Sequence, residues 1–270
     1  MLVQNFILQQ EVSLKDDGYK GNKMELKKFE RIDDLNLSGL QIIQNKNHFC
    51  FGTDAVLLAS YADIKPNMQV LDLCTGNGII PILLAAKTKA AHITGIEFFE
   101  EHVQMAKRSV LLNGLQEKVD FLTGDIKEIR SLVSCGSFDY VTVNPPYKPL
   151  QSGFQNQNDL KTAARHEILC TLEDVIKAAR FALRSGGRLA MVHRADRLAE
   201  VICFMRENRI EPKKLTMISA RKEEKPKLIL IEGLSDGGTG IMITAPLFIY
   251  GDDGKYTKQF REIYGKEDIQ

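Results

Sequence analysis

The feature that most constrains this fold is a regular alternation of short apolar runs and helix-like segments, which begins at Gln69. Apolar or β-branched runs occupy residues 69–74, 92–97, 118–124, 138–144 and 187–193. Segments with helical periodicity lie between them, at 79–87, 100–114, near Ile126 and at 171–183. Such alternation is typical of a parallel sheet covered by helices on both faces. The sequence therefore predicts an α/β fold with a doubly wound, mostly parallel, seven-stranded Rossmann-like sheet.

The C-terminal part of the chain has a different pattern. Between residues 213 and 249, strand-like runs at 214–220, 227–233 and 240–250 are separated by turn-rich segments. Hairpin-like connections of this kind predict an antiparallel C-terminal strand pairing.

A chain of 270 residues with 44% hydrophobic residues can bury one substantial core. We expect a single domain over 24–270 and an N-terminal extension over 1–23. Met24 is the expected natural start, because Lys20 and Gly21 just upstream can be encoded by a ribosome-binding sequence.

Several classes of protein do not fit this sequence. No apolar run reaches the ~18 residues that a membrane span needs, and the first residues do not resemble a secretory signal. The five cysteines form no C-x-x-C pair, so neither a zinc site nor a disulfide framework is indicated. A net charge of +1 argues against a protein that coats nucleic acid by bulk electrostatics. We expect a cytoplasmic monomer that binds neither a membrane nor a metal.

The first motif with chemical content follows the run at 69–74. Asp72 lies at the end of this strand, where a carboxylate can bind a ligand amine, and Gly76 and Gly78 allow the backbone to approach a ligand closely. Pro81 stands where a dinucleotide-binding motif needs its third glycine. Glu97 ends the next strand, about 20 residues on, where an acidic side chain can take both hydroxyls of a ribose. A nucleoside site is therefore predicted, although a generic strand-turn-helix junction would look similar.

The second motif is the tetrapeptide Asn144, Pro145, Pro146 and Tyr147, which follows the strand at 138–144. Two consecutive prolines stiffen the backbone and donate no backbone hydrogen bond, so their carbonyls are available as rigid acceptors. An amide oxygen and a carbonyl can accept both protons of a planar amine, and Tyr147 can stack on a flipped base. The simpler alternative is a Pro-Pro turn that ends a strand.

These motifs resemble those of class I S-adenosylmethionine-dependent methyltransferases. Residues 72–78 resemble their motif I, and Gly124, Asp125 and Ile126 resemble the turn that contacts the cofactor adenine. The tetrapeptide is similar to the N-P-P-Y of enzymes that methylate adenine N6, cytosine N4 or a glutamine amide. The resemblance implies S-adenosyl-L-methionine as the cofactor, bound by Thr53, Asp72, Thr75, Gly76, Gly78, Glu97, Asp125 and Ile126. It also implies Asn144, Pro145, Pro146 and Tyr147 as the catalytic residues.

A narrower resemblance concerns the substrate. Residues 47–59 resemble the element that covers the cofactor in bacterial methyltransferases acting on the tRNA adenine beside the anticodon, a family first described for valine tRNA. Thr53 belongs to this element, and it could also cap the helix that follows, a role compatible with cofactor contact. The segment 164–167 and Arg221 also look like that family. The resemblance implies N6-methylation of an adenine in tRNA. The residues that would bind the RNA are Lys148, Arg165, His166 and Arg221. Arg165 and Arg221 could equally lie on a solvated face, and His166 could equally be structural.

Two alternatives remain open. Methyltransferases that modify a release-factor glutamine also carry N-P-P-Y, but they have a helical bundle ahead of motif I. This chain has only about 68 residues there, including a strand-like run at 39–44. The other alternative is a non-catalytic module that binds a cofactor or RNA, against which the intact tetrapeptide argues.

Overall fold

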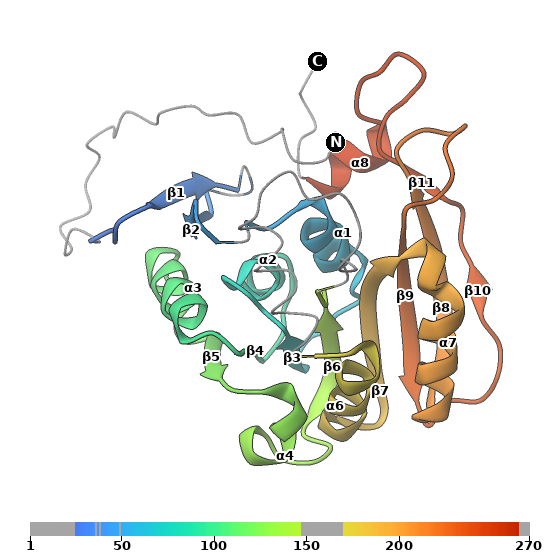
Figure 1. Ribbon diagram of the computed structural model, residues 1–270, viewed down its shortest axis with the longest axis horizontal. Helices are drawn as coiled ribbons and strands as arrows, with labels where there is room; N and C mark the ends of the chain where they lie inside the picture. The colour runs from blue at the N-terminus through green and yellow to red at the C-terminus, as the bar shows by residue number, and fades with distance from the viewer. Residues whose placement is uncertain (1–24, 36, 38, 49, 147–169, 265–270) are drawn as a thin grey trace.

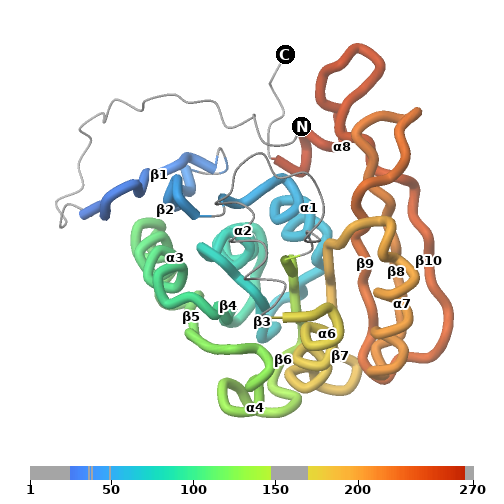
Figure 2. Tube along the Cα trace, viewed as in Figure 1, coloured from blue at the N-terminus to red at the C-terminus, as the bar shows by residue number. Residues whose placement is uncertain are grey.

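The computed structural model describes residues 25–146 and 170–264, apart from 36, 38 and 49. Five parallel strands form the centre of its main sheet: β3 (Gln69–Leu73), β4 (His92–Glu97), β5 (Val119–Thr123), β6 (Phe138–Val143) and β7 (Leu183–Arg194). Beyond β7 lie β9 (Leu228–Ser235) and β8 (Ile210–Ser219), each antiparallel to its neighbour. The order across the sheet is β8-β9-β7-β6-β3-β4-β5. Figure 2 shows this path, with β5 on one side and β8 on the other.

Helices cover both faces of the sheet. The first face packs against α1 (Thr53–Tyr61), α2 (Ile79–Lys87), α3 (Glu100–Leu112) and α8 (Lys258–Ile263). The second packs against α4 (Ile129–Leu132), α6 (Leu172–Ala182) and α7 (Leu198–Glu207). Strand residues alternate between the two cores, so that Val70 faces the first while Leu71 and Leu73 face the second. The predicted doubly wound α/β fold is confirmed (Figure 1).

The predicted strand count and the last hairpin need correction. The seven long strands are present, but two short ones, β10 (Met242–Ile243) and β11 (Leu247–Phe248), extend the sheet to nine strands within the described residues. The pairing of β8 with β9 is antiparallel, as expected. The following segment was expected to form another hairpin, but β10 pairs in parallel with β8. Since β7 and β8 occupy both edges of β9, this segment must cross to the free edge of β8.

The N-terminal part forms a separate hairpin of β1 (Glu30–Asp34) and β2 (Gln41–Asn45). It is attached to α3, because Ser109 Oγ accepts a hydrogen bond from the Ile43 N–H at 2.9 Å and Asn113 bonds with the Gln41 backbone. Among the described residues, no helix combines the length and the apolar character that a membrane crossing requires.

Candidate active site

The predicted site residues gather at one edge of the sheet. Because β3, β4, β5 and β6 are parallel, their carboxyl ends meet at the same edge. Asp72 is the last residue but one of β3, Glu97 ends β4 and Asn144 follows β6. Residues far apart in the sequence are therefore placed side by side where such folds bind ligands.

Asp72 is fully buried and only partly satisfied. Its Oδ1 accepts a hydrogen bond from the Thr142 hydroxyl at 2.6 Å. Its Oδ2 is buried without a hydrogen bond of regular geometry among the described residues, although the Thr75 hydroxyl also interacts with this carboxyl. Burial raises the pKa of this carboxyl to about 7. A buried carboxylate oxygen without a partner costs stability, so Oδ2 is suited to accept from a cationic ligand group.

Glu97 is also buried but is well supplied with donors. Its Oε2 accepts from the Gly76 N–H at 3.0 Å, and its Oε1 accepts from the Phe99 N–H at 3.1 Å. Burial alone would raise its pKa, but His102, 3.6 Å away, and these two N–H groups together lower the pKa of Glu97 below its usual value. The ionised carboxylate thus holds the glycine turn, and each oxygen keeps one lone pair for a ligand hydroxyl.

The two glycines of the turn have different roles, which the sequence does not separate. Both adopt positive φ, +58° at Gly76 and +83° at Gly78. A Cβ on Gly76 would meet nothing within 4 Å among the atoms described, whereas a Cβ on Gly78 would lie 2.7 Å from the Phe121 ring and 3.0 Å from the Ala106 methyl. Gly76 therefore leaves space beside Asp72 and Glu97, and Gly78 allows α2 to pack against the core.

We expect Gly78→Ala to lower the free energy of unfolding by about 2–4 kcal/mol, because strain at positive φ adds to overpacking against Phe121. Gly76→Ala has the backbone strain without the clash and should cost about 1–2 kcal/mol. Urea denaturation of both variants would measure the difference. Equal losses of stability would contradict the packing role of Gly78.

The remaining cofactor candidates line the same edge. Thr75 is buried, and its N–H donates to the Ile96 carbonyl at 3.0 Å. The Gly124 N–H donates to the Glu97 carbonyl at 2.9 Å, which places Asp125 and the buried Ile126 directly beyond β5. Asp125 caps the short helix Ile126–Glu128 by accepting from the Lys127 N–H at 2.9 Å.

Thr53 is the first residue of α1, and it does not cap the helix. The N-cap is Gly52, and no side chain forms a capping hydrogen bond there. The Thr53 hydroxyl instead interacts with Tyr264, which follows α8. The C-terminal segment therefore contacts the start of α1.

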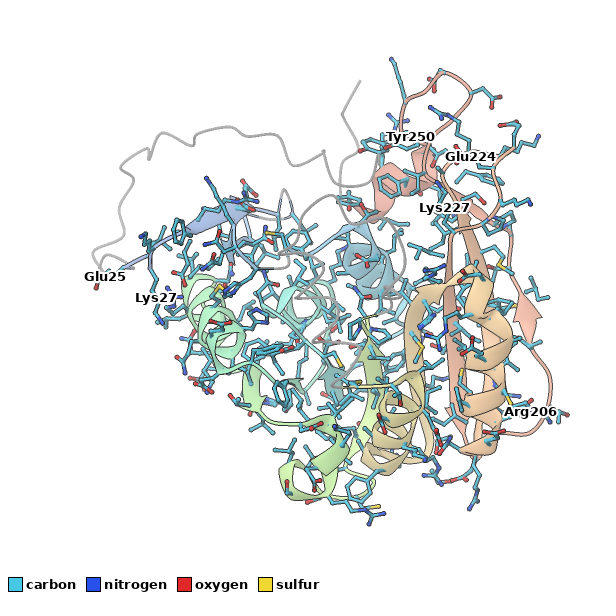
Figure 3. The ribbon with its side chains drawn as sticks, viewed as in Figure 1. Glu25, Lys27, Arg206, Glu224, Lys227 and Tyr250 are labelled. Atoms are coloured by element: carbon cyan, nitrogen blue, oxygen red, sulfur yellow. The ribbon has the colours of Figure 1, made fainter. Side chains whose placement is uncertain are left out.

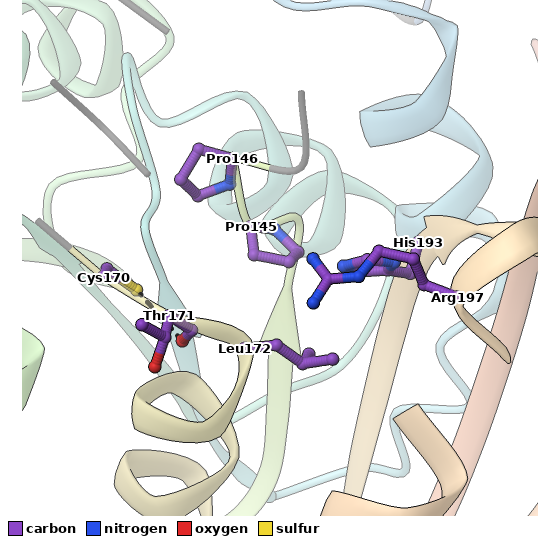
Figure 4. A pocket seen from close by; sticks show the side chains of 7 residues that line it. All are labelled: Pro145, Pro146, Cys170, Thr171, Leu172, His193 and Arg197. Atoms are coloured by element: carbon purple, nitrogen blue, oxygen red, sulfur yellow. Dashed lines mark hydrogen bonds between the residues drawn. The ribbon is translucent and has the colours of Figure 1, made fainter. Parts of the chain in front are cut away.

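A pocket of about 110 Å³ lies beside the Pro-Pro segment (Figure 4). Its lining residues are Pro145, Pro146, Cys170, Thr171, Leu172, His193 and Arg197. Thr171 begins α6 through a capping box with Asp174, which fixes this wall of the pocket. Asn144 is half-buried directly before Pro145.

The sequence did not indicate His193 and Arg197. Figure 4 shows their side chains directed toward Pro145. Burial, with the charge of Arg197, lowers the pKa of His193 to about 4, so the ring is neutral near pH 7. Arg197 forms an ion pair with Glu200 at 2.6 Å. In the sequence, the one indication that His193 could belong to the site is its position at the carboxyl end of a predicted strand.

Other predicted residues fall elsewhere. Tyr147, Lys148, Arg165 and His166 lie outside the described residues. Arg221 follows β8 and is exposed, with its guanidinium 5.6 Å from the centre of the Tyr250 ring.

One group of side chains could hold a metal ion. Nitrogen and oxygen atoms of His48, Glu101 and His102 lie within 4.8 Å of one another, next to Glu97. His48 Nε2 lies 3.6 Å from Glu101 Oε1.

The chain matches the family model described as a methyltransferase domain over residues 64–230. A protein of Porphyromonas gingivalis named tRNA1(Val) (adenine(37)-N6)-methyltransferase is 30% identical over 187 residues, which cover 67% of this chain and 72% of that protein. A protein of Shewanella woodyi with the same name is 24% identical over 216 residues, covering 77% and 87%. A crystal structure of a predicted O-methyltransferase from Agrobacterium tumefaciens has the same fold, with a TM-score of 0.65 and 23% identity over 78% of this chain and 95% of that one.

Proposed function

This chain belongs to the methyltransferase domain family, and from that membership we propose that it transfers the methyl group of S-adenosylmethionine to N6 of an adenine in tRNA, the adenine beside the anticodon. The observation that carries this proposal is the position of Asn144 and Pro145. They follow β6 at the edge where Asp72 and Glu97 end their strands. The atoms proposed to bind the amine and the carboxylates proposed to bind the cofactor therefore follow strands that end at the same edge of the sheet.

The cofactor supplies a methyl group on a sulfonium, and the residues present fit it. The buried Oδ2 of Asp72 would accept from the methionine ammonium group. Glu97 would accept from the ribose hydroxyls, and Asp125 from the adenine amine. The open side of Gly76 would leave space for the ligand between these carboxylates. Thr53, Thr75, Gly78 and Ile126 would complete this part of the site.

The catalytic task is to make a poor nucleophile reactive. The N6 lone pair of adenine is delocalised into the ring. If the Asn144 side-chain oxygen and the Pro145 carbonyl accept hydrogen bonds from its two N–H groups, the nitrogen can become pyramidal with its lone pair toward the methyl group. The residues act by positioning and by fixed dipoles rather than as a strong base. Pro146 stiffens the turn, and Tyr147 would supply the ring on which the flipped base stacks.

The buried carboxyl of Asp72 makes a pH dependence expected. Its pKa of about 7 belongs to the protein without ligand, and an ammonium group binds only the ionised form. Cofactor affinity should therefore fall about fivefold between pH 7 and pH 6, because the ionised fraction of Asp72 falls from about one half to about one eleventh. Calorimetry across this range would measure the effect.

Asp72→Asn is the matched control. It should bind the cofactor weakly and without this pH dependence. It should also be more stable than the wild type at pH 8, because a folded-state pKa above the unfolded value makes the ionised carboxyl destabilising at that pH. If cofactor affinity changed with pH to the same extent in the wild type and in Asp72→Asn, the pH dependence would belong to another group.

The substrate is tested by incubation with labelled cofactor and separate pools of tRNA, ribosomal RNA, DNA and protein. We expect methylation of tRNA, and we expect it to disappear when the adenine beside the anticodon is changed to guanine. That adenine is partly unpaired in an exposed loop, which lowers the cost of flipping it. Methylation of a release-factor glutamine, with none on any tRNA, would favour the alternative.

A further inference from the structure

A column of stacked aromatic rings lies at the C-terminal corner of the sheet. Tyr250 and Tyr256 stack with ring centres 5.2 Å apart and an angle of 18° between the planes. Phe260 continues the stack 4.9 Å from Tyr256, and Tyr264 lies 5.0 Å from Phe260. Beyond Tyr250, the Arg221 guanidinium carbon lies 5.6 Å from the ring centre. Tyr250 is thus the last ring of this aromatic column (Tyr250, Tyr256, Phe260 and Tyr264).

The backbone holds Tyr250 firmly at this position. Its N–H donates to the Ala220 carbonyl at 2.9 Å, and the preceding Ile249 N–H donates to the Ser219 carbonyl at 3.1 Å. Tyr250 and Tyr256 also form an antiparallel bridge. Because the backbone is fixed and the ring also stacks on Tyr256, the ring is held in a position where it can stack on a planar ligand.

This corner lies on the same edge of the sheet as the candidate active site. Since β9 is antiparallel to β7, Leu228 at its start pairs with Arg194 at the end of β7, and it also pairs with Ile218 near the end of β8. The turn 220–227 therefore shares the carboxyl edge with Asn144. Three strand spacings separate β6 from β8, which at about 4.8 Å each is roughly 15 Å.

The turn 220–227 is basic and exposed. The turn carries four exposed basic side chains, Arg221, Lys222, Lys225 and Lys227, and only two carboxylates, Glu223 and Glu224. The Arg221 and Lys227 ion pairs with Glu224 are both long, at 3.6 Å. Figure 3 shows Tyr250, Glu224 and Lys227 gathered at this corner, beside α8 and away from the labelled Glu25 and Lys27. Phosphates could thus be contacted around an aromatic ring.

We propose that Tyr250 and Arg221 form a stacking site for an unpaired nucleobase of the RNA substrate, with the lysines of the turn 220–227 contacting its phosphates. The site rests on the proposed function, because its partner is the single-stranded part of the methylated RNA. Because the Arg221 guanidinium already lies over the Tyr250 ring, a base would have to enter between the two, with Arg221 moving outward to cover the other face of the base. Such stacking tolerates any base, so this site positions the loop without reading its sequence.

The chain contains no tryptophan, which allows a direct test. A Tyr250→Trp variant carries the sole indole of the protein, and an unmodified single-stranded RNA oligonucleotide should quench its fluorescence by stacking. The matched control is Phe181→Trp, because Phe181 also pairs with an arginine, Arg130, at 4.8 Å. Phe181 lies near the end of α6, at the opposite edge of the sheet.

We expect saturable quenching of the tryptophan at 250 by single-stranded RNA, less with a blunt RNA duplex, and none of the tryptophan at 181. Tyr250→Ala should weaken binding of the oligonucleotide about tenfold, while Tyr250→Phe should retain most of the affinity. Quenching at neither position would overturn the proposal, as would equal quenching at both. Stronger quenching by the duplex would also overturn it.

A kinetic comparison separates this proposal from the proposed function. Tyr250→Ala should raise KM for tRNA about tenfold and leave kcat and cofactor affinity nearly unchanged. If the wild-type protein methylates tRNA and Tyr250→Ala has an unchanged KM, the stacking site is wrong while the proposed function stands. If the wild type methylates no tRNA but quenching occurs as expected, the proposed function fails and the RNA site remains.

Discussion

Replacing Asn144 with alanine should lower kcat for adenine methylation by at least about 100-fold, with cofactor affinity almost unchanged. The Asn144 side-chain oxygen would accept its strongest hydrogen bond from N6–H as the nitrogen becomes pyramidal. Removing this oxygen therefore raises the barrier to methyl transfer without weakening cofactor binding. The Pro145 carbonyl alone cannot replace it, because one acceptor leaves the second N–H unpaired. Single-turnover kinetics with saturating cofactor would measure the chemical step directly.

Asn208→Ala provides a matched control. Asn208 follows α7, where its amide donates to the Phe204 carbonyl at 2.9 Å, far from the carboxyl edge of the sheet. We expect a small loss of stability in this variant and an unchanged kcat. If folded Asn144→Ala turned over at the wild-type rate, the proposed mechanism would have to be abandoned.

Glu97→Ala should weaken cofactor binding by about 1–3 kcal/mol, roughly 5- to 150-fold. Two losses combine in this variant. The ribose hydroxyls lose a charged acceptor, and the Gly76 N–H loses the carboxylate oxygen that holds it at 3.0 Å. Calorimetric titration with S-adenosylhomocysteine, which cannot react, isolates binding from turnover.

Glu101→Ala is the control for charge alone. Glu101 lies close in sequence on α3, but its side chain is exposed and its contact with His48 is long, at 3.6 Å. Its removal should change the affinity less than threefold, because exposed ion pairs contribute little. Unchanged affinity in a folded Glu97→Ala protein would refute the ribose role.

The local signals in the sequence predicted the central elements well. α2 covers the predicted 79–87, and α6 begins at the capping residue Thr171. The predicted hairpin after β9 was wrong, because this segment joins the free edge of β8 in parallel. The simpler alternative for Thr53, that it caps α1, also fails, because the N-cap is Gly52. Helix α7 was missed, because only Val201 and Met205 of its residues are buried.

The periodicities and the strand ends could be read from the sequence, and they predict that Asp72, Glu97 and Asn144 meet at one edge of a parallel sheet. The surroundings of these residues could not be read in this way, because they depend on how distant segments pack. The pKa of Asp72 depends on burial and on Thr142, which belongs to another strand. Gly78 is required because of Phe121 on β5, which follows two helices and one strand later in the chain. Arg221 meets Tyr250 only because β11 pairs with the end of β8. Periodicity is local and can be read from the sequence, whereas burial, orphaned acceptors and stacking depend on which distant segments pack together.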